Sequence, residues 1–329
     1  MKRIVLTTTL TLTTALPFVL RGADYDENPN RFSFGPRFGL NFKANFNNNA
    51  VNPGPATGGA NHFYNDGYVL LDGSGDAGGL TSNWGYPNAS QVVGNSMQFH
   101  AIQSDASSSP SDDPQFGAEL VYQRVLGSLS PALSGCWGLE TGFGFTHIDL
   151  RDNQSGNVSA TTDSYSLNGV LPPAAGYNGT PNGPGALLGD TPTRTATPGT
   201  LTTHDKLAGQ LFSFRLGPFV EWHFSSKLSL SGSAGLTLAP TTLDYDFSEN
   251  ASLSGGGNFA ASGHACKTEL LYGPYVGGTL RYDFDKCLSA FVGAQFQNLT
   301  ALDMSVNGRS ARFDPGAAIY LSAGIGWKF

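Results

Sequence analysis

The sequence is poor in charged residues and has no long apolar run after its N-terminal segment. Only 13% of the 329 residues are charged, whereas soluble domains usually carry about a quarter. A soluble domain with so few charges needs another way to stay in solution, but a protein whose outer surface faces lipid does not. Because no run of about 18 apolar residues follows the N-terminal segment, no membrane-spanning helix is predicted there.

Cysteines and clustered bases are also scarce. Cys136, Cys266 and Cys287 are odd in number and match no metal-binding spacing, so they predict neither a disulfide framework nor a metal site. The chain has 18 Lys and Arg against 25 Asp and Glu, for a formal net charge of −7. It lacks the basic cluster that binds nucleic acid. We therefore expect no nucleic-acid partner, and we find no cofactor motif.

The first 23 residues have the order of a secretory signal peptide. A basic start at Lys2 and Arg3 precedes an uncharged stretch through Leu20, and the small residues Gly22 and Ala23 follow after Arg21. An N-terminal membrane anchor is the alternative. We expect 1–23 to be a signal peptide and 24–329 to form the mature domain.

Glycine and aromatic residues are abundant, with 43 Gly, 22 Phe and 12 Tyr. In the last segment, large apolar residues alternate with small or polar ones. The apolar set is Ile319, Leu321, Ala323, Ile325, Trp327 and Phe329. Alternation with a period of two residues is typical of a β-strand with two different faces. An apolar face toward lipid and a polar face toward the interior are the pattern of a membrane β-barrel.

Seven further segments show the same alternation. They are 32–46, 115–126, 136–150, 205–224, 227–239, 268–284 and 287–302. With the C-terminal segment they predict an all-β fold, an antiparallel up-and-down transmembrane β-barrel of eight strands. An even number of strands is what bacterial barrels of this kind have.

Two details of these segments make the prediction specific. The first segment is expected to remain one strand through its end, with Phe42 and Phe46 facing outward. Pro36, Pro218 and Pro274 interrupt three segments. Since proline has no amide hydrogen to donate, each predicts a bulge or an end of strand pairing.

The connections between the segments alternate in length. The short ones are 127–135, 225–226 and 285–286, and the long ones are 47–114, 151–204, 240–267 and 303–315. Short periplasmic turns and long extracellular loops are typical of bacterial barrels. This pattern places both termini in the periplasm and the long loops outside. The Gly, Pro, Ser, Thr and Asn content of 151–204 predicts a loop without a core.

The alternation also places charged residues in the barrel interior. They are Arg37, Glu119, Glu140, Arg215, Glu221 and Arg281. An eight-stranded barrel has room inside only for side chains, and an unpaired buried charge costs several kcal/mol. We therefore predict an internal network of ion pairs, either as structural support or as the lining of a narrow ion path.

Aromatic residues gather near the short-turn ends of the strands. They are Trp137, Trp222, Tyr282, Trp327 and Phe329. Aromatic side chains are enriched where a membrane meets water, because the ring is apolar and its edge polar. These residues are predicted to form the inner interfacial girdle.

The eight segments and the terminal Phe329 resemble the eight-stranded OmpA/OmpX-type outer-membrane proteins. The resemblance covers the strands but not the long loops, and the first loop is longer than in small members of that family. It implies that the strand ending at Phe329 is the signal read by the barrel-assembly machinery. A ten-stranded barrel, with added strands at 62–71 and 96–103, is the alternative.

Two groups of polar residues suggest chemistry, but neither matches a complete motif. Asp72 and Asp76 flank a Gly-Ser-Gly stretch that is loosely similar to a Ca²⁺ loop, without its closing Glu. His204 and Asp205 lie near the predicted outer rim, but no nucleophile motif accompanies them. We predict no catalytic, cofactor or metal site.

These observations favour a monomeric protein of the bacterial outer membrane that contacts lipid and has no enzymatic activity. Its long loops would contact solutes, ligands or other cells. A passive porin-like channel is the first alternative and a barrel-rim enzyme the second. The sequence leaves open what the loops bind and the state of the cysteines.

Overall fold

The computed structural model describes residues 29–48, 51–73, 76–103, 107–108, 110, 114–130, 134–254 and 258–329. The predicted signal peptide, 1–23, lies outside these residues. Strands dominate the described chain. None of its helices has the length and apolar character needed to cross a membrane.

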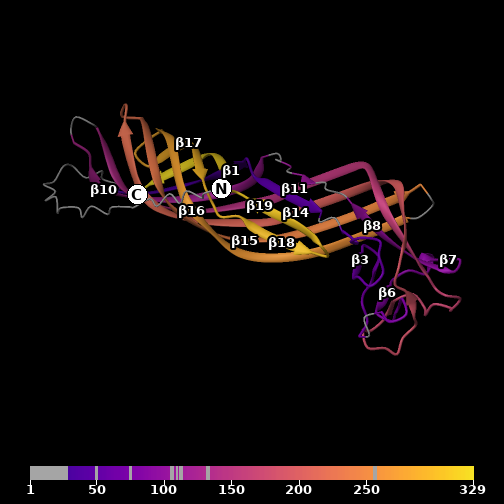
Figure 1. Cartoon of the computed structure of the whole chain (residues 1–329). Helices are drawn as coiled ribbons and strands as arrows, with labels where there is room; N and C mark the ends of the chain where they lie inside the picture. The colour runs from indigo at the N-terminus through magenta and orange to yellow at the C-terminus, as the bar shows by residue number, and fades with distance from the viewer. Residues whose placement is uncertain are drawn as a thin grey trace, which may run out of the picture.

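Eight strands close into a ring (Figure 1). In order around the ring they are β10 (Gln115–Ser128), β1 (Asn30–Leu40), β20 (Ala318–Lys328), β17 (Leu288–Gln297), β16 (Asn258–Asp283), β15 (Leu228–Leu253), β14 (Thr193–His223) and β11 (Gly135–Ser166). Every pairing is antiparallel, and the pairing of β10 with β11 closes the ring. The predicted eight-stranded antiparallel barrel is confirmed.

The two faces of the ring strands differ as the alternation predicts. On β20, Ile325 and Trp327 are 61% and 63% exposed, while Tyr320 on the other face is 1% exposed. The exposed apolar side chains of the other strands form a continuous band around the ring. The inner face of the same stretch carries mostly Gly, Ser, Gln, Arg and Glu.

The three prolines each interrupt the ladder on one side only. Pro36 pairs with Ala118 of β10, but the pairing of β1 with β20 is broken at this point and resumes in the same register. Pro218 likewise breaks the pairing of β14 with β15 alone, and at Pro274 the pairing of β16 with β17 ends. The missing amide hydrogen therefore interrupts the pairing at Pro36 and Pro218 without a bulge, and the expected end of pairing is seen only at Pro274.

Four ring strands continue far beyond the ring, as Figure 1 shows. β11, β14, β15 and β16 have 32, 31, 26 and 26 residues, whereas β1, β17 and β20 have 11, 10 and 11. The prediction of a coreless loop over 151–204 is wrong, because Arg151–Ser164 pairs with Thr193–Lys206. Polar outward side chains caused the error, since a strand in water does not need an apolar outer face.

The other half of the ring continues as a second sheet. Its order is β18 (Leu302–Val306), β19 (Arg309–Asp314), β2 (Lys43–Asn48) and β9 (Ser107–Ser108). These strands follow or precede β17, β20, β1 and β10 in the chain, so the barrel opens above its rim into two sheets. A large apolar core joins them, with Leu207, Tyr245, Phe313 and Met304 among its buried members.

The first predicted strand is not continuous. Asn41 has a φ of 62°, a left-handed conformation that asparagine tolerates better than most residues. The chain changes sheet there, from β1 to β2. Phe42 and Phe46, predicted to face outward, are therefore 1% and 2% exposed and lie in the core between the two sheets.

The long strands exchange the polarity of their faces at the rim. On β14, Phe214 points outward and Arg215 inward within the ring, whereas Lys206 points outward and Leu207 inward beyond it. The same exchange occurs on β11, from Phe143 outside the ring to the buried Leu150. Along each of these strands the outer face thus changes from apolar to polar, and the inner face changes from polar to apolar.

A small module sits at the far end of the extension, drawn in the lower right of Figure 1. Its elements are β3 (His62–Tyr64), β4 (Gly67–Val69), β5 (Leu80–Thr81), β6 (Trp84–Tyr86), η1 (Ala89–Gln91), β7 (Val92–Val93), β8 (Ser96–Gln103), β12 (Tyr177–Asn178) and β13 (Leu188–Gly189). It has its own apolar core around Trp84, Phe99 and Tyr165.

The ten-stranded alternative is wrong. Strands do form within 62–71 and at 96–103, but β8 pairs with Ser159–Ser166, the outer end of β11, far from the ring. Hydrophobic alternation gave no information about which strands lie within the ring, because the distal module also buries one face of its strands.

Candidate functional site

The barrel interior holds a layer of buried ion pairs at mid-height. Arg215 donates from Nη1 to Glu119 Oε2 at 2.9 Å and from Nε to Glu140 Oε1 at 3.2 Å. It also donates to Gln295 Oε1 at 2.6 Å. Two predicted interior carboxylates, Glu119 and Glu140, therefore contact the guanidinium of Arg215, which was also predicted to lie inside. Together with Gln295, these contacts join β14 to β10, β11 and β17.

A second layer lies closer to the short turns. Arg31 Nη1 lies 2.7 Å from Glu221 Oε2, and both side chains are 1% exposed. Arg281 donates to Gln123 Oε1 at 2.9 Å, and Gln123 donates in turn to Glu140 Oε2 at 2.8 Å. This chain of contacts links the two layers. Arg31 was not among the predicted residues, although its place beside the outward Phe32 is a signal that would have found it.

Arg37, the remaining predicted charge, lies at the top of the polar interior. Its Nη1 donates to Ser213 Oγ at 3.1 Å, and its guanidinium carbon is 3.5 Å from the centre of the Tyr320 ring. Such stacking of a cation on an aromatic face stabilises a desolvated charge by about 2 kcal/mol. Arg37 is thus held by a hydroxyl and a ring, below the apolar core that contains Tyr320.

Two glycines of β11 make room for these guanidinium groups. A Cβ atom at Gly144 would lie 1.9 Å from Arg37 Nη1, and one at Gly142 would lie 2.6 Å from Arg215 Nε. Any side chain at either position would displace an arginine from its partners. Part of the high glycine content is therefore explained by the large arginine side chains opposite.

A small cavity lies beside this network. A cavity of about 20 Å³ lies among Glu119, Glu140, Arg215, Ser233 and Gln295, and a space of this size holds about one water molecule. Above it, the buried side chains of the apolar core cap the barrel where the two sheets meet. Within the described residues, the polar interior ends at this apolar layer.

The aromatic residues predicted to form a girdle lie at the short-turn end of the ring. Trp222, Tyr282, Trp327 and Phe329 are 37%, 44%, 63% and 50% exposed, and Trp137 is half-buried. The Phe329 ring stacks on Phe32 with centroids 5.6 Å apart. The backbone of Phe329 also exchanges hydrogen bonds with Asn30, so the two described chain ends are adjacent.

Cys136, Glu221 and His223 place a thiol, a carboxylate and an imidazole within 4.8 Å of one another near the same end. These are ligand types that zinc accepts. However, Arg31 Nη1 donates to both carboxylate oxygens of Glu221 at 2.7 Å, so a positive charge already lies at this group. The arginine makes the cluster a poor site for a divalent cation.

His204 and Asp205 do not form a catalytic pair. Being consecutive on β14, they point to opposite faces: His204 is exposed and hydrogen-bonded to Asn153 Oδ1 at 2.7 Å, whereas Asp205 is buried. Asp205 instead accepts a hydrogen bond from Tyr245 at 2.8 Å, and burial raises the pKa of Asp205.

Asp72 and Asp76 accept hydrogen bonds from each other's backbone amides, at 3.0 and 2.8 Å. Burial raises the pKa of Asp76. One carboxylate oxygen on each side is thus engaged in closing the turn, and Ser74 and Gly75 between them lie outside the described residues. These contacts fit a turn better than the loose resemblance to a Ca²⁺ loop.

The distal module carries a buried polar cluster that the sequence did not predict. Arg194 of β14 donates to both oxygens of Asp163, at 2.7 and 2.6 Å. Tyr64 donates to the same carboxylate at 2.7 Å and lies 2.6 Å from the hydroxyl of Tyr165. Burial raises the pKa of Tyr64 and Tyr165, so both remain protonated. The cluster ties the module to the ends of β11 and β14.

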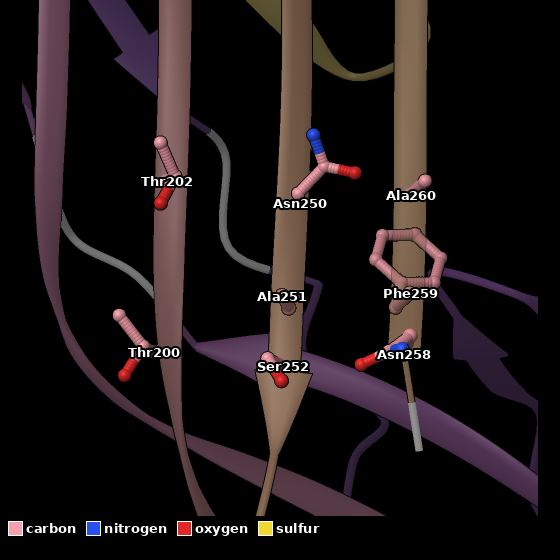
Figure 2. Close-up of a pocket in the computed structure, with 8 residues that line it drawn as sticks. All are labelled: Thr200, Thr202, Asn250, Ala251, Ser252, Asn258, Phe259 and Ala260. Carbon is pink, nitrogen blue, oxygen red and sulfur yellow. The ribbon is translucent and has the colours of Figure 1, made fainter. Parts of the chain in front are cut away.

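The outer face of the long strands forms a polar surface beyond the rim. Near the end of β14, β15 and β16 it contains an open pocket of about 380 Å³ (Figure 2). Thr200, Thr202, Asn250, Ser252 and Asn258 contribute polar side chains to this pocket, and Phe259 lines it as well.

No known protein family and no curated protein matches this sequence. Among solved structures, the chain is similar to Ail, the attachment invasion locus protein of Yersinia pestis, in complex with a heparin analogue. The two share 10% identity over 91% of this chain and 99% of Ail, with a TM-score of 0.26. The outer membrane protease OmpT of Escherichia coli gives 11% identity over 92% of this chain and 97% of OmpT, with a TM-score of 0.29.

A Pseudomonas aeruginosa FadL homologue gives 12% identity, covers 92% of this chain and 91% of the homologue, and has a TM-score of 0.20. At such scores the fold is better judged from the strand pairings of the chain itself. In strand number and topology, those pairings give the eight-stranded antiparallel barrel that the resemblance to OmpA/OmpX-type proteins implies.

Proposed function

We propose that this chain is a non-enzymatic surface protein of the bacterial outer membrane. In this proposal the eight-stranded ring is a closed membrane anchor, and the two-sheet extension with its distal module is the part that meets the surroundings. The observation that carries the proposal is the exchange of face polarity along the long strands.

The outer band of the ring supports the membrane location. Its exposed side chains are apolar over the length of β20, which has 11 residues, and all but Ala323 are large. A strand needs about 9–11 residues to cross the hydrocarbon layer. Beyond the band, outward positions become polar or charged, as with Lys206 and Asp246. A soluble protein would not expose such a band, since it would aggregate.

The two ends of the ring differ in a way that supports one orientation. The short turns at Ser225 and Asp285 and the described chain ends lie together, whereas the extension rises from the other end. Outer-membrane barrels place short turns in the periplasm and long connections outside. We therefore propose periplasmic termini and an extracellular extension, a monomeric chain, and assembly through the strand ending at Phe329.

The filled interior supports an anchor over a passive channel. Arg215 with its partners and Arg37 with Tyr320 occupy the polar part, and the apolar core of the two sheets caps it. An ion crossing this path would have to leave water and pass the buried apolar layer. The opposite directions of His204 and Asp205 give the rim-enzyme alternative no support.

Two natural cysteines test the orientation. Cys266 is exposed on the extension, and Cys287 is exposed at a short turn. A membrane-impermeant maleimide added to intact cells is expected to label Cys266 and to spare Cys287, and both should react after the outer membrane is permeabilised. Cys266→Ser and Cys287→Ser identify each signal. Labelling of Cys287 alone in intact cells would refute the proposed orientation.

Conductance in planar bilayers tests the closed interior. The purified protein is expected to insert without stepwise ion currents, while its heat-modifiable migration in detergent gels shows that it is folded. Stepwise openings that persist in highly purified, folded protein would favour the channel instead.

A further inference from the structure

Beyond the rim, the outer surface of the extension is divided into a charged and an uncharged zone. Strand pairing places side chains of β11, β14, β15 and β16 in rows across the sheet. The rows closer to the rim contain Asp149, Arg151, Lys206, Asp244 and Asp246. The next rows outward contain no Asp, Glu, Lys or Arg.

We name this uncharged zone the distal polar face and define it by three rows. They are Asn153–His204–Ser248–Ser262, Ser155–Thr202–Asn250–Ala260 and Asn157–Thr200–Ser252–Asn258. Neighbouring strands lie about 4.8 Å apart, and side chains on one face recur about every 7 Å along a strand. The face is therefore a regular array of hydroxyl and amide groups.

Most of these polar groups are available to a ligand. Asn250, Ser252 and Asn258 are exposed, and within the described chain their side chains make no hydrogen bond. Only His204 with Asn153, and Ser155 with Thr202 at 3.5 Å, are paired side chain to side chain. The array thus keeps donors and acceptors directed outward, as the sticks in Figure 2 show for the side chains of Asn250 and Thr202.

The face is also hollowed. The pocket of about 380 Å³ lies over its two outer rows, between the side chains of β14, β15 and β16. Ala260 is the one small apolar residue in those rows, and it lines the pocket with Asn250 and Asn258 (Figure 2). An open depression on a strand surface suits an extended ligand better than a small molecule, which needs an enclosed pocket.

We propose that the distal polar face binds a neutral polysaccharide. Sugar hydroxyls donate and accept hydrogen bonds, and Ser, Thr and Asn side chains do both as well. A repeating array of such groups matches a polymer with repeating hydroxyls, and many weak contacts in parallel supply the affinity. This inference rests on the proposed function, because it requires the extension to be outside the cell.

The charges around the face select against a polyanion. The two adjoining rows hold Arg151 and Lys206 against Asp149, Asp244 and Asp246, with Arg151 paired to Asp149 at 2.8 Å, and the whole chain has a formal net charge of −7. A sulfated or phosphorylated polymer would find no Lys or Arg on the face itself, and the adjoining rows hold one more acid than bases. An apolar protein partner would find no large apolar side chain among the three rows.

The test measures binding of the full-length, detergent-solubilised protein to immobilised neutral polysaccharides, namely dextran, amylose, mannan and galactan, with heparin as the polyanion. Retention on at least one neutral polymer and none on heparin at physiological salt is expected. The variant Asn250→Asp/Asn258→Asp keeps the shape of both side chains but adds charge, and it is expected to bind at least tenfold more weakly.

The matched control is Thr242→Asp, which adds a charge to an outward position of β15 next to the rim. Its binding is expected to remain within twofold of the wild type. No retention on any neutral polymer, preference for heparin, or equal binding by the double variant would each overturn the proposal. Heat-modifiable migration and Cys266 labelling of the same proteins report the barrel and its orientation separately, so the anchor function can stand if this inference fails.

Discussion

Arg215 and Glu119 form an ion pair of 2.9 Å across the barrel interior, between β14 and β10, which are not neighbours in the ring because β11 lies between them. The contact is 5% exposed at the carboxylate and 9% at the guanidinium. Interactions of this kind join strands that are not adjacent in the ring, whereas backbone pairing connects only adjacent strands.

Loss of Arg215 is expected to destabilise the barrel strongly. Arg215→Met removes the cation that lies beside both Glu119 and Glu140. Breaking a buried ion pair by removing one partner costs about 3–5 kcal/mol, because a charge is left without compensation. Urea unfolding in lipid vesicles, followed by tryptophan fluorescence, measures the change in free energy of unfolding.

The control for this variant removes the charges together. Arg215→Met/Glu119→Gln/Glu140→Gln leaves no buried carboxylate at this layer and is expected to regain most of the lost stability. If the single variant unfolds at the same urea concentration as the wild type, the ion pairs do not contribute to stability as argued.

Two phenylalanines of the first predicted strand are expected to behave in opposite ways. Phe42 is 1% exposed and stacks on Phe313 with centroids 5.8 Å apart, whereas Phe34 is 57% exposed on the outer band. Phe42→Ala leaves a cavity and is expected to cost about 3–5 kcal/mol. Phe34→Ala is expected to cost much less, since lipid fills the space. Equal losses in the same unfolding assay would contradict the change of sheet at Asn41.

Asp205 is expected to make stability depend on pH. Burial raises its pKa, with Asp152 and Glu249 adding repulsion, so the folded chain binds this proton more tightly than the unfolded chain. The stability contributed by the group is complete below the unfolded pKa of about 3.9. It is lost as the pH rises through the higher folded pKa.

The variant Asp205→Asn separates this effect from others. It is expected to be more stable than the wild type at pH 7, with the difference vanishing near pH 3, where the wild-type carboxyl is protonated. Asp246→Asn, at a side chain 52% exposed, serves as the control and is expected to change stability little. A loss of stability at pH 7 in Asp205→Asn would show that the charge is favourable.

The four tryptophans are expected to form two groups that differ in how strongly brominated lipids quench their fluorescence. Trp137, Trp222 and Trp327 lie at the short-turn end of the outer band, whereas Trp84 is 0% exposed in the distal module. Bromine near the headgroup is expected to quench the first group more than bromine at the chain ends. Trp84→Phe should remove the unquenched fraction, and quenching of that fraction by lipid would contradict the position of the module.

The sequence determined the barrel because a lipid-facing strand needs an apolar residue at every second position. That requirement produces the alternation of apolar and polar residues that is seen in the strand segments from Phe32 to Phe329. The same alternation places Arg215 and Glu119 on the inner face. The lengths of the links determined which strand ends lie together. These features depend on local periodicity and chain length alone.

The tertiary structure decided what lies beyond the rim. The outer side chains of the strands there are polar, so 151–204 has the composition of a loop, although Ala160 and Leu201 within it belong to a buried core. The left-handed conformation of Asn41 redirects the chain, so Phe42 lies in a buried core and not on the outer band as predicted. This change of direction does not alter the hydrophobic alternation on either side of Asn41. Pairing between distant segments, which no local pattern records, fixed the two sheets, the distal module and the rows of the polar face.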